Sequence, residues 1–60
     1  MPIIQVFMVE GRTKDQKKSL IRELTDGAVR AVGAKPESVR VILSEMPISN
    51  FGIAGETKVD

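Results

Sequence analysis

The 60-residue sequence contains neither cysteine nor histidine. Without cysteine there is no disulfide bond and no thiolate chemistry, and without histidine there is no imidazole catalysis and no usual zinc site. Candidate bases and nucleophiles are therefore limited to carboxylates, lysines, serines and the amino terminus. A chain this short buries only about 60% of its unfolded surface and is marginally stable alone. Oligomerisation is the remaining way to support such a small domain.

A strong basic excess and long apolar runs are also missing. Nine Lys and Arg against eight Asp and Glu give a net charge of +1, which argues against a general nucleic-acid surface. The stretch KDQKKSLIR is only weak support for such a surface. No apolar run approaches the roughly 20 residues that span a bilayer, and the start lacks the features of a signal peptide. We expect a soluble cytoplasmic protein with no nucleic-acid or membrane partner.

The apolar pattern predicts strand, helix, strand and a short hairpin. Residues 3–9 are almost all apolar and rich in β-branched side chains, which predicts a strand. The stretch TKDQ is typical of a capping box with Thr13 as N-cap, and helical spacing continues to about Val32, where Gly33 ends the helix. Residues 39–45 predict a second strand. The stretch MPISNFGIAGE indicates a loop and a short hairpin before the polar tail TKVD.

These elements predict one α/β (α+β) domain over residues 1–60, built from a β-α-β unit with parallel strands. Two strands alone are marginal in water, and a strand that is apolar on both faces is covered on both faces. Another chain is therefore expected to complete the sheet. Gly27 lies inside the helix, where glycine costs about 1 kcal/mol relative to alanine, so we expect close packing there.

Pro2 is the first candidate for chemistry. It suits the first position of a strand because proline has no backbone donor. Once Met1 is removed, as is normal before a small second residue, Pro2 becomes a secondary amine at the chain terminus. Nearby cations and an apolar wall would lower the pKa of this amine, and a base tuned toward neutrality suits proton abstraction next to a carbonyl.

Two arginines and one aromatic are the other candidates. Arg12 follows the carboxyl end of the first strand, where ligands bind in α/β units. Arg40 interrupts an apolar strand, either as an exposed edge residue or as a bidentate clamp on a carboxylate. Phe51 lies before a glycine, either as a core residue or as a pocket wall. None of these features decides the function by itself.

Six short motifs in order along the chain decide the family. They are MPI at the start, EGRT followed by DQK, LIRE in the helix, SVRVI in the second strand, SEM after it, and FGIAGE near the end. Together they cover nearly the whole chain. The sequence resembles the 4-oxalocrotonate tautomerase family, also called 2-hydroxymuconate tautomerases.

The resemblance implies a cofactor-independent isomerase, an intramolecular oxidoreductase of aromatic hydrocarbon catabolism that binds no metal. Its substrate would be a small unsaturated dicarboxylic acid, a 2-hydroxymuconate-type dienol converted to a 2-oxo-3-enoate. Pro2 would be the general base. Arg12 would hold the distal carboxylate, while Arg40 of a neighbouring subunit would bind the 2-oxygen and the nearer carboxylate.

The resemblance also assigns the walls and the assembly. Phe51 would wall the site and keep the pKa of the amine low, with Val9 and Ile53 as further apolar wall residues. The family pattern is a homohexamer, a trimer of dimers in which each dimer shares one four-stranded sheet.

Two alternatives stay open at this point. Superfamily dehalogenases and hydratases of 3-haloacrylates need a carboxylate to activate water, and the stretch after the second strand offers none before Glu56. A non-catalytic oligomeric module that binds an acid is the other alternative. Retention of Met1 would favour the module, because an acylated proline nitrogen is not basic.

Overall fold

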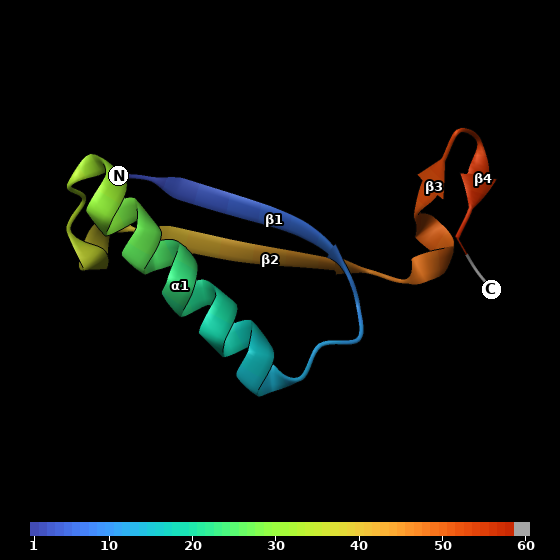
Figure 1. The fold of residues 1–60 in the computed structure, drawn as a ribbon, viewed down its shortest axis with the longest axis horizontal. Helices are drawn as coiled ribbons and strands as arrows, with labels where there is room; N and C mark the ends of the chain where they lie inside the picture. The colour runs from blue at the N-terminus through green and yellow to red at the C-terminus, as the bar shows by residue number, and fades with distance from the viewer. Residues whose placement is uncertain (59–60) are drawn as a thin grey trace.

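The computed structural model describes residues 1–58 and shows a β-α-β unit followed by a small hairpin (Figure 1). Val59 and Asp60, the end of the expected polar tail, lie outside the described residues. The elements are β1 (Ile3–Val9), α1 (Lys14–Val32), the 3₁₀ turn η1 (Pro36–Ser38), β2 (Arg40–Met46), the 3₁₀ turn η2 (Ile48–Asn50), β3 (Gly52–Ile53) and β4 (Glu56–Thr57).

Strands β1 and β2 pair in parallel, from Ile3 opposite Arg40 to Val9 opposite Met46. This confirms the predicted β-α-β unit. The second strand begins one residue later than predicted, because the backbone N–H of Val39 donates to the carbonyl of Pro36 (3.1 Å) and closes η1. The strands define two ends of the sheet. Its amino end carries the starts of β1 and β2, and its carboxyl end carries their last residues.

Both limits of α1 follow from local chemistry, as predicted. The Thr13 hydroxyl accepts from the backbone N–H of Gln16 (3.1 Å), and the Gln16 side chain accepts from the backbone N–H of Thr13 (2.9 Å). Gly33 ends the helix in the left-handed region at φ +71°, with its N–H donating to the Val29 carbonyl (3.1 Å). A left-handed C′ residue is the usual position for glycine.

The two faces of the β1–β2 sheet differ in how well they are covered. Helix α1 packs mainly over β2, and the strand residues toward the helix are half-buried: Ile4, Val6, Met8, Val41 and Leu43. The opposite side, here called the outer face, carries Ile3, Gln5, Phe7, Val9, Arg40, Ile42, Ser44 and Met46. On it Ile3 is 63% exposed and Phe7 69% exposed.

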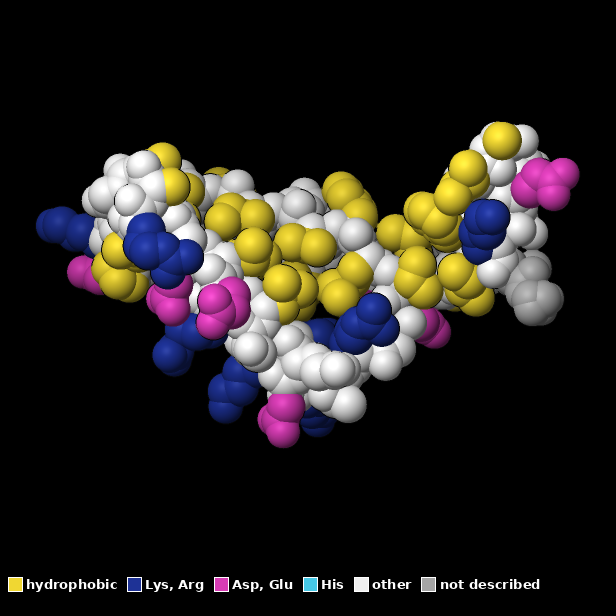
Figure 2. Space-filling model, in the orientation of Figure 1, with side chains coloured by type: hydrophobic (Ala, Val, Ile, Leu, Met, Phe, Trp, Pro, Cys, Tyr) yellow, Lys and Arg dark blue, Asp and Glu magenta, His cyan; other side chains and the backbone are white. Residues whose placement is uncertain are grey.

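The described chain does not close a core of its own. No side chain among residues 1–58 is fully buried, and the radius of gyration is 14.3 Å, against about 10 Å for a compact chain of this length. In the view of Figure 2, hydrophobic side chains form a band that follows the strands and continues onto the hairpin, while charged side chains gather on the helix. Within the part of the chain described here, no helix has the length and hydropathy needed to cross a bilayer.

Two expectations about the helix are wrong for the single chain. Val32, expected as the last residue of the helical apolar spacing, is exposed, whereas Val29, about one turn before it, is half-buried. Gly27 was expected to mark close packing, yet a Cβ built there meets only the Arg30 side chain, at 4.0 Å.

Candidate active site

Pro2 and Arg40 lie side by side at the amino end of the sheet. The backbone N–H of Arg40 donates to the Pro2 carbonyl (3.0 Å), which continues the parallel pairing by one residue. Pro2 is half-buried, and Met1 before it is exposed. While Met1 is attached, the Pro2 nitrogen is an amide and has no basicity. The backbone thus fixes the candidate base and the candidate oxyanion-binding arginine at one end.

The Arg40 side chain is held by the turn that precedes it. Its Nη1 donates to the Glu37 carbonyl (2.7 Å) in η1. Because Arg40 lies opposite Ile3 in the register, its side chain is on the outer face. Arg40 is exposed in the single chain.

Arg12 lies at the carboxyl end, in the turn between β1 and α1. Gly11 has φ +129°, a conformation that side chains disfavour, and this shapes the turn. Arg12 lines a cavity of about 220 Å³ together with Met8, Gln16, Lys17 and Leu20. The N–H of Glu10 donates to the Met46 carbonyl (2.8 Å) and closes this end of the sheet.

The structure separates Arg12 from Pro2. Six rises of about 3.3 Å separate the first and last residues of β1 (Ile3–Val9), so its two ends are about 20 Å apart. A bidentate arginine contact needs donor–acceptor distances near 3 Å. Within one chain these two residues therefore cannot contact the same small molecule.

The predicted wall residues also lie away from Pro2 in the single chain. Val9 ends β1 and is half-buried on the outer face. Phe51 is 39% exposed and Ile53 is 53% exposed. Both belong to the hairpin segment, which extends beyond the end of β2 and stands clear of the β-α-β unit (Figure 1). These apolar side chains are presented outward rather than packed into their own chain.

A tight turn shapes this hairpin, as predicted. Strands β3 and β4 pair antiparallel, with Gly52 opposite Thr57 and Ile53 opposite Glu56. The connecting residues Ala54 and Gly55 both have positive φ, 55° and 84°, which is typical of a two-residue type I′ hairpin. Glu56, the carboxylate that the dehalogenase alternative would need, is exposed in β4 at the far side of the molecule from Pro2.

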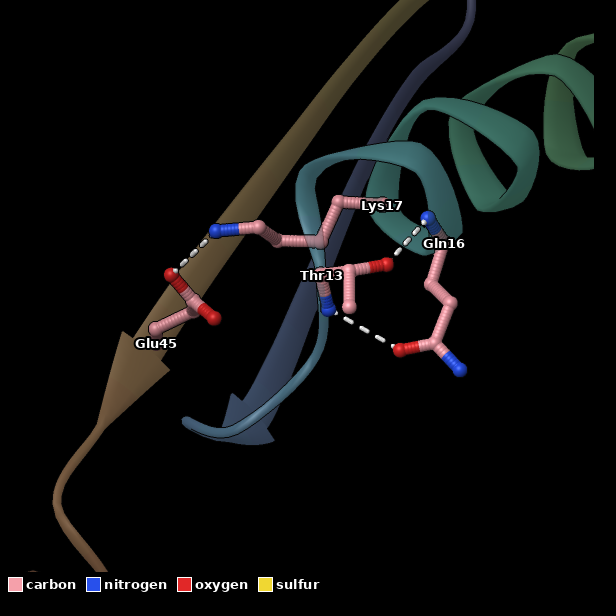
Figure 3. Close-up of polar contacts among 4 residues, drawn as sticks. All are labelled: Thr13, Gln16, Lys17 and Glu45. Carbon is pink, nitrogen blue, oxygen red and sulfur yellow. Dashed lines mark hydrogen bonds and ion pairs between the residues drawn. The ribbon is translucent and has the colours of Figure 1, made fainter.

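Sequence reasoning missed one polar contact at the carboxyl end. The Lys17 Nζ lies 3.0 Å from Oε1 of Glu45 on β2 (Figure 3). The two side chains are 29% and 30% exposed, so the pair is partly shielded from water. Glu45 as a second charge in an apolar strand was the available signal. The pair ties the start of α1 to the end of β2, beside Arg12.

The chemical groups of the candidate residues suit the binding of an anion. Within residues 1–58 there is no group of three or more carboxylate, histidine or cysteine side chains that could hold a metal ion. The candidate residues instead offer an amine, once Met1 is removed, and two guanidinium groups. Such a set binds carboxylates and developing oxyanions.

Comparison with known proteins identifies the family of the chain. A family profile described as "Tautomerase enzyme" matches residues 2–60. A probable tautomerase from Ralstonia nicotianae is 52% identical over 58 residues, which cover 97% of this chain and 83% of the relative. A 2-hydroxymuconate tautomerase from Pseudomonas putida is 50% identical over 56 residues, covering 93% of this chain and 89% of the relative.

Solved structures agree on the fold. An apo unfused 4-oxalocrotonate tautomerase superposes with a TM-score of 0.92 at 38% identity, covering 97% of this chain and all of the other. A heterohexamer 4-oxalocrotonate tautomerase from Chloroflexus aurantiacus J-10-fl gives 0.90 at 32% identity, covering 95% and 92%. The chain therefore belongs to the 4-oxalocrotonate tautomerase family, and its activity is that of a keto–enol tautomerase.

Proposed function

We propose that the protein converts 2-hydroxymuconate-type dienols to 2-oxo-3-enoates, with the Pro2 amine as the base after removal of Met1. The observation that carries this proposal is that each chain holds Pro2 and an exposed Arg40 at the same end of its sheet, joined through the backbone, so that a neighbouring subunit can supply the Arg40 that acts beside the base. The name of the Pseudomonas putida relative supports the substrate class.

The proposed reaction moves one proton and changes no overall oxidation state. The neutral amine takes the proton of the 2-hydroxyl group, and the negative charge that develops is shared between the 2-oxygen and the conjugated carbons. Arg40 stabilises the charge on oxygen, because preorganised cationic donors in a site shielded from water act most strongly where charge develops. The protonated amine then returns the proton to a carbon of the chain, which leaves the 2-oxo group.

The remaining candidates position the substrate. Arg12 is proposed to hold the distal carboxylate, since its guanidinium can donate two parallel hydrogen bonds to a carboxylate. Phe51, Val9 and Ile53 are proposed to wall the site, exclude water and thereby keep the amine neutral. Their exposure in one chain is consistent with walls that act on a neighbouring copy.

The proposed assembly is a homohexamer, a trimer of dimers, over a single domain. Three observations support association with copies of the same chain: the two-stranded sheet has open edges, the outer face is apolar and exposed, and residues 1–58 hold no fully buried side chain. The heterohexameric relative supports six subunits. A cytoplasmic location stays a prediction.

The assembly is tested by sedimentation of the wild type beside Phe7→Glu. Phe7 is the most exposed large hydrophobic side chain of the outer face, so a carboxylate in its place, once buried by a neighbouring copy, would be unpaired and costly. The wild type is expected to sediment as a hexamer and Phe7→Glu as smaller species, with Phe7→Leu as the matched apolar control. A monomeric wild type would contradict the proposed assembly.

The activity is tested by an ultraviolet assay of 2-hydroxymuconate ketonisation. The protein is first confirmed by intact mass to lack Met1, and Pro2→Ala is measured beside it. Loss of a positioned general base is expected to lower the rate by about 10²- to 10⁴-fold. Slow conversion by the wild type, or a rate indifferent to Pro2, would refute the proposal. Haloacrylate turnover would favour the dehalogenase alternative, and retained Met1 with no turnover would favour the non-catalytic module.

A further inference from the structure

The turn η1 lies in the connection between the helix and β2, and both backbone and side-chain hydrogen bonds hold it. The backbone N–H of Ser38 donates to the Lys35 carbonyl (2.9 Å), and the Ser38 hydroxyl donates to the same carbonyl (2.9 Å). The N–H of Val39 donates to the Pro36 carbonyl (3.1 Å). Pro36 at the first position fixes its own φ. The conformation of the turn is therefore closely defined.

A backbone carbonyl of the turn binds the side chain of Arg40. Its Nη1 donates to the Glu37 carbonyl at 2.7 Å, the shortest side-chain hydrogen bond given for residues 1–58. A guanidinium has five N–H donors in a rigid plane, so a bond at one of them sets the plane and leaves others for a ligand. The backbone of the same residue is held by the Pro2 carbonyl (3.0 Å). Arg40 is thus fixed at both its main chain and its side chain.

We infer that Ser38 is a positioning residue of this tautomerase: by closing η1 on the Lys35 carbonyl it aims the Glu37 carbonyl at Arg40 and so orients the guanidinium toward the substrate. The Ser38 hydroxyl donates to the Lys35 carbonyl, so in this inference it acts on the turn and not on the substrate. The inference rests on the proposed function in one respect, the role of Arg40 in turnover. The orientation of the guanidinium by η1 is independent of that role.

The kinetic test compares Ser38→Ala with a matched control. Thr25→Ala is the control, because the Thr25 hydroxyl also donates to a backbone carbonyl, that of Ile21 (2.8 Å), but lies in the helix. Ser38→Ala is expected to lower kcat by about 3- to 10-fold, the loss expected for one hydrogen bond, with little change in KM. Ser38→Thr keeps the hydroxyl and is expected to restore kcat. Thr25→Ala is expected to leave kcat within about twofold.

A double-variant cycle separates positioning from general destabilisation. If Ser38 acts through Arg40, Ser38→Ala is expected to cause no further loss in an Arg40→Lys background, because the lysine cannot make the same planar contact. An equal loss in both backgrounds would overturn the inference, as would an unchanged kcat in Ser38→Ala alone.

A second readout does not depend on turnover. The order parameter of the Arg40 Nε–H bond, measured by NMR relaxation, is expected to fall in Ser38→Ala and to stay unchanged in Thr25→Ala. An Arg40 side chain that is mobile in the wild type, or unaffected by Ser38→Ala, would refute the positioning role. An ordered Arg40 in a protein inactive on 2-hydroxymuconate would refute only the proposed function.

Discussion

The two ends of the β1–β2 sheet carry different chemistry. The amino end holds Pro2 and Arg40, tied together by a backbone hydrogen bond. The carboxyl end holds Arg12, a small cavity and the Lys17–Glu45 pair. Each end has part of what the proposed dicarboxylate site needs, and the length of β1 keeps the two ends about 20 Å apart. One chain therefore carries both groups of proposed site residues without bringing them together.

Symmetry offers a simple way to bring the halves together. In a twofold symmetric dimer the same surface meets itself, and two sheets joined antiparallel at their edges place the amino end of one chain beside the carboxyl end of the other. The open edges of the two-stranded sheet permit such a joint. Substitutions at the two ends should accordingly affect different kinetic parameters. Chains substituted at opposite ends should restore activity to each other in a mixed oligomer.

At the amino end, Arg40→Ala is expected to give the larger loss. Removing a donor from a developing oxyanion costs about 10²- to 10³-fold in kcat. Steady-state kinetics on the dienol substrate measures this, with Arg22→Ala on the exposed helix surface as the matched arginine control. A loss confined to KM would mean that Arg40 binds the substrate without stabilising the charge that develops.

At the carboxyl end, Arg12→Ala is expected to raise KM by about 10- to 100-fold, the cost of one lost charged hydrogen-bond pair. The loss should fall on binding because the distal carboxylate keeps its charge throughout the reaction. An analogue without the distal carboxylate is the control substrate, and its KM should not change. Equal effects on both substrates would contradict the role given to Arg12.

Mixed oligomers sharpen the comparison further. Pro2→Ala and Arg12→Ala chains are unfolded together, refolded and assayed at low substrate concentration. If each site takes Pro2 from one chain and Arg12 from another, random pairing restores about a quarter of the sites. That is a several-fold gain over either variant alone. Activity equal to the mean of the two parents would show that both residues come from one chain.

The smallest expected effect touches neither end. Gly27→Ala removes the helix cost of glycine, about 1 kcal/mol, and its Cβ meets only the Arg30 side chain, at 4.0 Å, in the described chain. Urea denaturation should show a stability gain of about that size, with kcat unchanged. A loss of stability instead would indicate that another copy packs against Gly27.

Local chemistry made much of the fold predictable. The capping box at Thr13 and the left-handed Gly33 set the limits of α1, and the apolar run of β1 was correct at both ends. The second strand was misplaced by one residue because Val39 caps η1 through a hydrogen bond that composition does not reveal. Signals confined to a few neighbouring residues were therefore sufficient for the elements, but not for every boundary.

The site was less predictable because it depends on contacts between residues that are far apart in the sequence. Lys17 and Glu45 are 28 residues apart, and only the packing of α1 on β2 brings them together. Arg12 and Pro2 could be named from the family resemblance, but helical and strand periodicity give no information on which chain supplies each. The roles of Pro2, Arg12, Arg40, Phe51, Val9 and Ile53 stay predictions.

The separation of the two ends has a consequence for gene duplication. If each site takes the amino end of one chain and the carboxyl end of another, two copies of the gene can each lose the site residues of a different end. One copy can lose Pro2 and the other Arg12, and a mixed oligomer still contains complete sites. Neither gene product is then active alone, so both genes are retained. Because a strand of seven residues separates the two ends, an enzyme made of identical chains could thereby become one that requires two different chains.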